Sequence, residues 1–249
     1  MARKRLDVLL VERGLFESRA RARAAIEAGG VAVDGRTASR PSEAVEETAV
    51  LDAVPAHPWV GRGALKLEHA LRLWPVKIDG RVVLDVGAST GGFTEVCLER
   101  GAARVYAVDV GRGQLHPRLK TDPRVVELEG TDARSLGPTL VPEPVDVVVC
   151  DVSFIGLAKA LPAALVLARP GGDLIALVKP QFEVGPGKVG KGGLVKDEAD
   201  RLAALQAVIG FTERSGWRVE ASAESPVTGG EGAREWLLWA RKSLAIEPG

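Results

Sequence analysis

The first 55 residues place their apolar side chains first at helical spacing and then at strand spacing. Residues 6–13 and 19–29 carry apolar residues three and four positions apart, which predicts two short amphipathic helices. Ser18 stands where it can cap the second of these helices. Residues 31–39 alternate around an Asp-Gly pair, which is typical of a β-hairpin. The pattern therefore predicts a small α+β domain over residues 1–55.

From residue 63 onward, short continuous apolar runs alternate with helical segments, and seven of these runs predict strands. Strands that are apolar on both faces belong to a sheet covered on both sides, and helical crossovers make such a sheet mostly parallel. We therefore expect an α/β domain with a mostly parallel, seven-stranded, Rossmann-like sheet over residues 63–245. Residues 56–62, between the two domains, contain proline and glycine and predict a linker.

The charges of the chain balance overall but are unevenly distributed. The formal net charge is zero, yet residues 1–40 carry nine Lys and Arg against five acids. Residues 41–60 carry four acids and neither Lys nor Arg. A basic end on a neutral chain indicates a local surface for a polyanion, so the first domain is the candidate for binding nucleic acid.

Several classes of protein are disfavoured by the sequence. Cys97 and Cys150 stand far apart in apolar surroundings, which favours neither a disulfide framework nor a zinc site, and we expect no requirement for a metal. The apolar runs fall short of the roughly 18 to 20 residues that span a bilayer. Glu12 and Arg13 interrupt the apolar stretch behind the basic N-terminus, which argues against a signal peptide. We therefore expect a cytoplasmic protein without a membrane span.

A glycine-rich turn follows the first strand of the second domain and opens a helix. Ligands of doubly wound sheets bind at the carboxyl ends of the strands, and glycine lets the backbone approach them closely. Asp109, at the end of the next strand, is placed to accept the hydroxyls of a ribose, and Asp132, past the third strand, to reach an adenine amine. The candidate residues of the turn itself are Asp85, Gly87, Ala88, Ser89, Thr90, Gly91, Gly92 and Phe93.

The same turn discriminates between two cofactors. A dinucleotide needs the G-x-G-x-x-G pattern that receives a diphosphate, whereas here Ala88 and Ser89 follow the first glycine and Asp85 precedes it. An acidic side chain disfavours a diphosphate and favours the cationic methionine end of S-adenosylmethionine. We therefore expect S-adenosylmethionine as the cofactor. The alternative is a tight turn that binds no ligand.

Four ionisable residues stand in apolar surroundings, where a charge is costly unless it is paired or used. They are Lys66, Asp151, Lys179 and Glu235. Methyl transfer to a hydroxyl benefits from a general base in line with the donor, and an amine serves as that base once burial and a nearby cation lower its pKa. We assign this role to Lys179. The alternative is two structural salt bridges, Lys66–Asp151 and Lys179–Glu235.

Taken in order, Lys66, Asp151, Lys179 and Glu235 resemble the K-D-K-E tetrad of FtsJ-type ribose 2′-O-methyltransferases. The whole chain resembles the TlyA family, whose members are named haemolysins and are regarded as ribosomal RNA 2′-O-methyltransferases. The resemblance implies a class I methyltransferase that moves a methyl group from S-adenosylmethionine to a ribose 2′-hydroxyl of ribosomal RNA, with cytidine as the target. The stretches that carry it are RLDVLLVERGLFESRARARAAIEAGGVAVDG, WVGRGALKLEHAL, LDVGASTGGFTEVCLERGA, VDVVVCDVSFI, LVKPQFEVG and GAREWLLW.

The chain departs from the family pattern in two places. Residues 61–63 are Gly-Arg-Gly where the family often has Ser-Arg-Gly. Residues 232–234 are Gly-Ala-Arg where the family often has Gly-Asn before the final glutamate stretch. The second departure adjoins Glu235, whereas the other three residues of the tetrad carry over unchanged.

Residues 1–55 resemble the alpha-L RNA-binding domain of a small-subunit ribosomal protein, tyrosyl-tRNA synthetases and pseudouridine synthases. Phe16 is the only aromatic residue of this segment, so contacts to phosphates and to RNA shape are favoured over base stacking. The alternative is a solvated helix face that binds nothing. The resemblance implies RNA contacts through Arg5, Ser18, Arg19, Arg23 and Arg36.

Three other functions compete with methylation of ribosomal RNA. A methyltransferase fold without activity would only bind RNA, and the intact lysines and Asp151 argue against this. A dehydrogenase is disfavoured because the diphosphate-binding glycine pattern is missing. A membrane-lytic haemolysin is disfavoured because neither a membrane span nor a convincing amphipathic membrane helix is present in the sequence.

Overall fold

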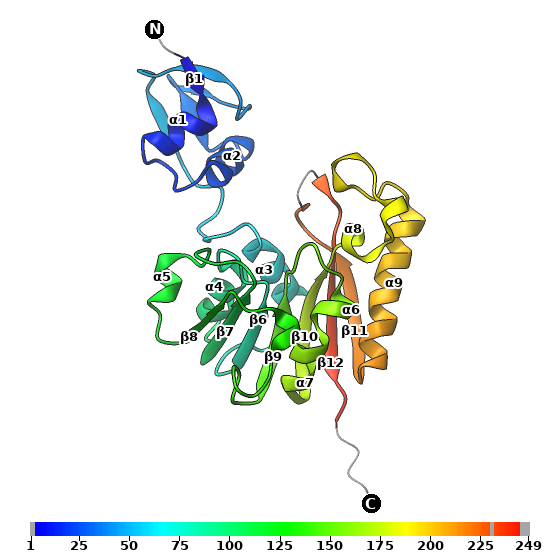
Figure 1. Ribbon diagram of the computed structural model, residues 1–249. Helices are drawn as coiled ribbons and strands as arrows, with labels where there is room; N and C mark the ends of the chain where they lie inside the picture. Colours follow the sequence, from blue (N-terminus) through cyan, green and yellow to red (C-terminus); the bar gives the residue numbers. More distant parts are fainter. Residues whose placement is uncertain (1–2, 230–231, 245–249) are drawn as a thin grey trace, which may run out of the picture. The chain divides into compact units, whose positions relative to one another are not determined.

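The computed structural model describes residues 3–229 and 232–244. The chain divides into two compact units, Met1–Pro58 and Trp59–Gly249, and each is described by itself (Figure 1). The predicted end of the second domain, residue 245, lies outside the described residues.

In the first unit, two helices and several short strands pack around a small hydrophobic core. Ser18 caps α2 as predicted, because its side-chain oxygen accepts a hydrogen bond from the backbone N–H of Arg21 at 3.3 Å. The predicted hairpin is also confirmed: β2 and β3 pair antiparallel around Asp34 and Gly35, both with positive φ. The elements are β1 (Arg3–Arg5), α1 (Leu6–Glu12), α2 (Arg19–Glu27), β2 (Val31–Val33), β3 (Arg36–Thr37), β4 (Ala44–Glu46) and β5 (Leu51–Ala53).

The hydrophobic pattern did not reveal β1, which pairs antiparallel with β4. A three-residue strand of charged side chains has no apolar periodicity, so only its distant partner identifies it. This pairing fixes Arg5 directly before α1, whose residues Leu6 and Leu10 are fully buried in the core of the unit.

The second unit contains a seven-stranded sheet in the order β11-β12-β10-β9-β6-β7-β8. The five strands from β10 to β8 are parallel, and β12 and β11 pair antiparallel at one side, so the predicted, mostly parallel sheet is confirmed. The predicted turn at residues 169–172 forms an irregularity within β10. The strands are β6 (Val82–Val86), β7 (Arg104–Asp109), β8 (Val125–Glu129), β9 (Val145–Cys150), β10 (Ala168–Val178), β11 (Trp217–Glu224) and β12 (Trp236–Lys242).

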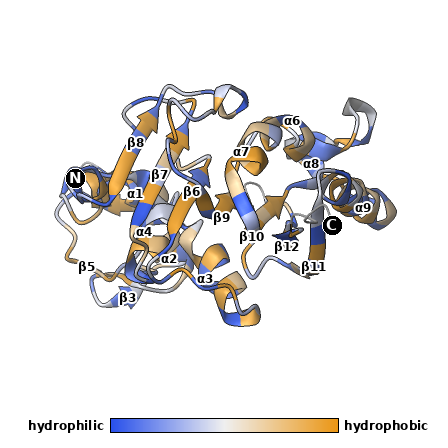
Figure 2. Ribbon diagram, turned by 90° about the horizontal axis from the view of Figure 1, so that it is seen from below, coloured by the Kyte–Doolittle hydropathy of each residue, from blue (hydrophilic) through white to orange (hydrophobic). Residues whose placement is uncertain are grey.

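Helices cover both faces of this sheet (Figure 1). Neighbouring strand residues face opposite layers: Val147 belongs to the core beneath α3 and α4, and Val148 to the core beneath α6, α7 and α9. Figure 2 shows hydrophobic colour on β6 and β9, two of the central strands of this sheet. Each buried Val or Leu contributes about 1.5–3 kcal/mol to folding, so these central strands form a rigid base for the site at their carboxyl ends.

The helices of the second unit are short except for the last. Pro162 separates α6 from α7, as the sequence predicts, because proline cannot continue the backbone hydrogen bonding of a helix. The helices are α3 (Ala64–Leu73), α4 (Gly92–Glu99), α5 (Pro117–Lys120), α6 (Leu157–Ala160), α7 (Pro162–Leu167), α8 (Pro180–Glu183) and α9 (Glu198–Arg214), with 3₁₀ turns at Ala133–Ser135, Pro186–Lys188 and Lys191–Gly193.

Candidate active site

The glycine-rich turn between β6 and α4 lies against the end of β9. Gly87 has φ +86°, and a Cβ atom at this position would lie 2.9 Å from the backbone oxygen of Asp151. Only glycine fits both the backbone conformation and the space. The turn that we expected to bind the cofactor is therefore held directly beside one of the expected catalytic residues.

A pocket of about 530 Å³ opens next to this turn. It lies at the carboxyl ends of β6, β7 and β9, where doubly wound folds bind ligands. Two of the predicted cofactor carboxylates, Asp109 and Asp132, contribute to its wall. The other residues of its wall are Gly87, Ser89, Val108, Val110, Gly111, Gln114, Thr131, Ala133, Arg134, Asp151, Val152, Ser153, Phe154, Ile155 and Ala160.

Asp109 ends β7 and organises the backbone on both sides of the pocket. Its carboxylate accepts hydrogen bonds from the backbone N–H of Ser89 at 2.8 Å and of Gly111 at 2.7 Å. A carboxylate has about four acceptor positions, so acceptor capacity is left for the two hydroxyls of a ribose. These acceptor positions and the close-approaching glycine turn fit S-adenosylmethionine.

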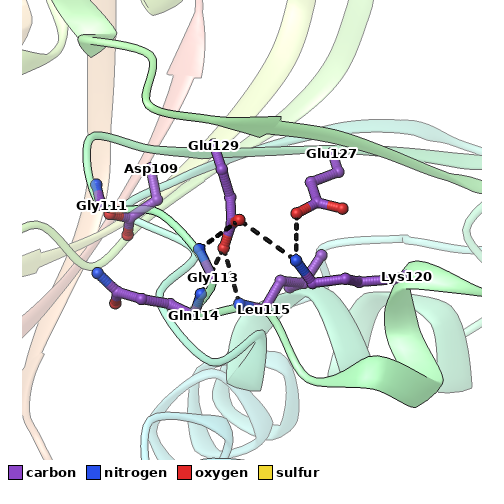
Figure 3. Close-up of polar contacts among 8 residues, drawn as sticks. All are labelled: Asp109, Gly111, Gly113, Gln114, Leu115, Lys120, Glu127 and Glu129. Atoms are coloured by element: carbon purple, nitrogen blue, oxygen red, sulfur yellow. Dashed lines mark hydrogen bonds and ion pairs between the residues drawn. The ribbon is translucent and has the colours of Figure 1, made fainter.

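Glu129, which the sequence analysis did not single out, holds a loop of the pocket wall. It ends β8 directly opposite Asp109 in the register of the two strands. Its carboxylate accepts hydrogen bonds from the backbone N–H groups of Gly113, Gln114 and Leu115, at 2.7, 2.6 and 2.9 Å (Figure 3). These hydrogen bonds, that of Leu115 first, hold the pKa of Glu129 at about 2, so the side chain ties down the loop that carries Gly111 and Gln114 into the pocket wall.

Asp132 follows β8 at the other side of the pocket. Its carboxylate accepts from the backbone N–H and the guanidinium group of Arg134, and the guanidinium group in particular lowers the pKa of Asp132 to about 2. The carboxylate is therefore charged at neutral pH. Its position at the rim fits the predicted contact with an adenine amine, which stays a prediction.

Asp85 differs from the expectation that it contacts the cofactor. Its side chain is completely buried and accepts a hydrogen bond from the Thr94 hydroxyl at 2.6 Å. Burial raises the pKa of Asp85 to about 7. Gly91 also turns away from the pocket, since a Cβ atom there would collide with Leu115 and Leu119. The sequence could not separate these two positions from their neighbours because the whole turn shares one motif.

A second pocket, of about 190 Å³, adjoins the glycine turn and contains one half of the predicted tetrad. Lys179 Nζ lies 2.6 Å from Asp151 Oδ1 and donates a hydrogen bond to the Ser153 hydroxyl at 2.9 Å. Lys179 is mostly buried, whereas Asp151 is partly open to the pocket. The remaining predicted turn residues, Ala88, Thr90, Gly92 and Phe93, also line this pocket.

The other half of the tetrad, Lys66 and Glu235, forms a buried ion pair. The alternative pairing expected from the sequence, Lys66–Asp151 and Lys179–Glu235, is therefore wrong. The reason is strand order: β10 pairs in parallel with β9, which brings the end carrying Lys179 beside Asp151. Glu235 precedes β12 on the other side of β10 and meets Lys66 of α3.

Two residues that follow Asp151 also escaped the sequence analysis. Ser153 orients Lys179, as described above. Phe154 lines the larger pocket, has φ +67° and is 92% exposed, with its ring 5.3 Å from that of Phe182. An exposed aromatic residue in a left-handed backbone conformation is uncommon, and only the structure reveals it.

The predicted RNA-contact residues lie in the first unit. Arg5 and Arg19 form ion pairs with Asp7, and Arg36 forms one with Glu43. Arg23 is exposed on α2. Ser18 serves as the cap of this helix, and whether it also contacts RNA stays a prediction.

Each of the two units matches a known protein family. Residues 4–51 match the model of the S4 domain, and residues 59–242 match that of the FtsJ-like methyltransferases. The chain is 49% identical to the 16S/23S rRNA (cytidine-2′-O)-methyltransferase TlyA of Mycobacterium tuberculosis. The alignment spans 244 residues and covers 97% of this chain and 91% of the relative. The chain belongs to the TlyA family.

Two further comparisons agree with membership in the TlyA family. YqxC of Bacillus subtilis, named as a candidate rRNA methyltransferase, is 43% identical over 239 residues, covering 95% of this chain and 85% of YqxC. The structure of a candidate haemolysin from Streptococcus thermophilus matches with a TM-score of 0.78 at 36% identity, covering 99% of this chain and 92% of that one. The family and fold expected from the sequence motifs are therefore confirmed.

Neither a cluster of metal ligands nor a membrane-spanning helix is present in the described part of the chain. Within residues 3–229 and 232–244, His, Cys, Asp and Glu side chains form no group of three or more that is suited to hold a metal ion. In the same part of the chain, every helix is too short or too polar to cross a membrane.

Proposed function

We propose that this protein transfers the methyl group of S-adenosylmethionine to the ribose 2′-hydroxyl of a cytidine in ribosomal RNA. The observation that carries the proposal is the Lys179–Asp151 pair, mostly buried, beside the glycine turn and open to the pocket at its edge. An amine in this position fits the removal of a proton from a hydroxyl. The relative from M. tuberculosis is named for this reaction on 16S and 23S rRNA.

The larger pocket would hold the cofactor. When bound, S-adenosylmethionine supplies an activated methyl group on a sulfonium centre. The free acceptor positions of Asp109 suit the ribose hydroxyls of the cofactor, and Asp132 suits the adenine amine. The close-approaching turn at Gly87 leaves room for its methionine end. The loop fixed by Glu129 closes the wall beside Gln114.

Lys179 would act as the general base. In its neutral form, its Nζ takes the proton from the 2′-hydroxyl as that oxygen accepts the methyl group, and the contacts with Asp151 and Ser153 fix the direction from which it does so. Holding donor and acceptor in line contributes further, because it removes the entropy cost of bringing them together. The buried pair Lys66–Glu235 links α3 to the residue before β12.

RNA would be bound by both units in different ways. Arginine side chains of the S4 domain suit phosphates and the shape of folded RNA. Phe154 presents an exposed ring at the wall of the larger pocket, where an unstacked base can lie against an aromatic face. Because its substrate is ribosomal RNA, the protein would work in the cytoplasm.

The test is to map 2′-O-methyl groups in ribosomal RNA from cells with and without this protein. We expect at least one cytidine to lose its modification in its absence and to regain it when purified protein and S-adenosylmethionine are added to the subunit. Protein that carries Asp109→Ala should fail to restore the modification. Identical maps in both cells, with no transfer by the purified protein, would refute the proposed function.

A further inference from the structure

Asp7 is a buried carboxylate at the start of α1 that holds two of the arginines predicted to contact RNA. Its side chain is completely buried. Arg5 donates from Nε to Oδ1 at 2.9 Å and from Nη2 to Oδ2 at 3.0 Å, and Arg19 donates from Nη2 to Oδ2 at 2.9 Å. Both arginines therefore bond the same carboxylate oxygen, which makes their guanidinium groups neighbours in space.

The two arginines reach Asp7 from different elements and stay half exposed. Arg5 ends β1 and Arg19 begins α2, and 49% and 57% of their side chains are accessible to solvent. A guanidinium group has five N–H donors. Arg5 uses two of its donors on Asp7 and Arg19 uses one, so both keep donors for an anion.

The charges in this cluster do not cancel. The hydrogen bonds from Arg5 are the largest influence that lowers the pKa of Asp7 to about 2, so the cluster of two cations and one anion keeps a net positive charge at neutral pH. Other cations of this unit differ: Arg36 faces Glu43 alone, and Lys4 contacts both Glu12 and Glu47. Two adjacent guanidinium groups would repel each other without the carboxylate between them.

We propose that Asp7 is a positioning residue that holds Arg5 and Arg19 as a two-arginine clamp for one phosphate of the RNA. Guanidinium groups bind phosphate oxygens through paired, charge-assisted hydrogen bonds. Fixing both groups before the RNA arrives removes the entropy cost of ordering two long side chains on binding. The inference rests on the proposed function, because it assigns the RNA contact of the same enzyme.

Asp7→Asn separates this role from simple electrostatics. The substitution makes the protein one unit more positive, so attraction to a polyanion alone would tighten RNA binding and steepen its dependence on salt. If the Asp7 carboxylate instead positions Arg5 and Arg19, its loss should weaken RNA binding about tenfold. The slope of log affinity against log salt concentration also becomes shallower by about one ion, because a phosphate contact is lost.

The experiment measures binding of the full-length protein to ribosomal RNA transcripts at several salt concentrations, with circular dichroism and thermal unfolding as checks of folding. Arg19→Lys is a second variant that leaves Asp7 and Arg5 paired and keeps the charge. It still tests the clamp if Asp7→Asn unfolds the S4 domain. We expect it to weaken binding about three- to tenfold. Arg40→Lys, at an exposed arginine of the same unit that is not among the predicted RNA contacts, is the matched control and should bind within twofold of the wild type.

The outcomes distinguish this inference from the proposed function. If the wild-type protein binds no ribosomal RNA, the proposed function fails. If the wild type binds and folded Asp7→Asn binds equally well or more tightly, Asp7 does not position a clamp. If Asp7→Asn does not fold, equal binding by Arg19→Lys and Arg40→Lys overturns the inference.

Discussion

At the scale of single residues, the fold disfavours the ionised form of the Asp85 carboxyl group. It lies fully buried behind the glycine turn, and the Thr94 hydroxyl is its hydrogen-bond donor. Burial is the main cause that raises its pKa to about 7, with nearby Asp151 and Asp109 adding to the effect. The neutral form is therefore preferred in the folded protein below this pH.

This shift predicts how stability depends on pH. Because the pKa is raised on folding, Asp85 contributes stability that is fully present below about pH 4 and is lost as pH rises toward 7. The loss is at most about 1.4 kcal/mol per pH unit for a single proton. In Asp85→Asn the amide does not titrate, so the difference in unfolding free energy between wild type and variant should change by roughly 3–4 kcal/mol across this window.

Denaturant unfolding at half-unit pH steps from 4 to 8 measures this difference without added cofactor. The subtraction cancels the contributions of Asp7, Glu129 and Asp132, whose pKa values are lowered by the hydrogen bonds that they accept. A difference that stays constant over the whole range would show that Asp85 is ionised in the folded protein.

At the scale of elements, the loop between β7 and α5 depends on a side chain from the neighbouring strand. Glu129 of β8 accepts three backbone hydrogen bonds from residues 113–115, and Gln114 belongs to the pocket wall (Figure 3). The loop has no regular hydrogen bonding of its own until α5 begins at Pro117. Glu129 therefore helps to set the shape of this loop and of the pocket wall, together with Asp109, which accepts from Gly111.

Glu129→Gln should weaken S-adenosylmethionine binding about tenfold, equivalent to about 1.4 kcal/mol, because an amide offers one acceptor oxygen in place of two charged ones. Calorimetry on the purified protein measures the affinity. Glu127→Gln is the matched control, since Glu127 lies on the same strand and pairs with Lys120 without contacting the loop. Wild-type affinity in Glu129→Gln, or an equal loss in Glu127→Gln, would contradict this role.

The elements themselves were largely predictable, because hydrophobic period, turn residues and helix caps are local signals. The continuous apolar runs of β6 and β9 and the break at Pro162 are examples. Interactions that depend on strand order were not predictable. Lys66 meets Glu235 only because β12 inserts between β10 and β11, and Glu129 meets its loop only because β8 lies beside β7.

At the scale of the whole molecule, the chain combines an S4 domain with an FtsJ-like methyltransferase domain. The first unit carries the arginine cluster around Asp7. The second carries the pocket and the Lys179–Asp151 pair. We infer that affinity for RNA comes mainly from the first unit and the chemical step from the second, so substitutions at Lys179 should change the rate of transfer while leaving binding of RNA and cofactor nearly intact.

Single-turnover methylation of ribosomal RNA by Lys179 variants over a range of pH tests the account most directly. Lys179→Ala should reduce the rate by about 10²–10⁴-fold, the contribution of a general base. Lys179→Arg should be almost as slow, because a guanidinium group keeps its proton at working pH. Lys159→Ala, at an exposed lysine of α6, is the control and should match the wild-type rate at every pH. Wild-type speed in Lys179→Arg would contradict the account, since a permanently charged side chain cannot be the base.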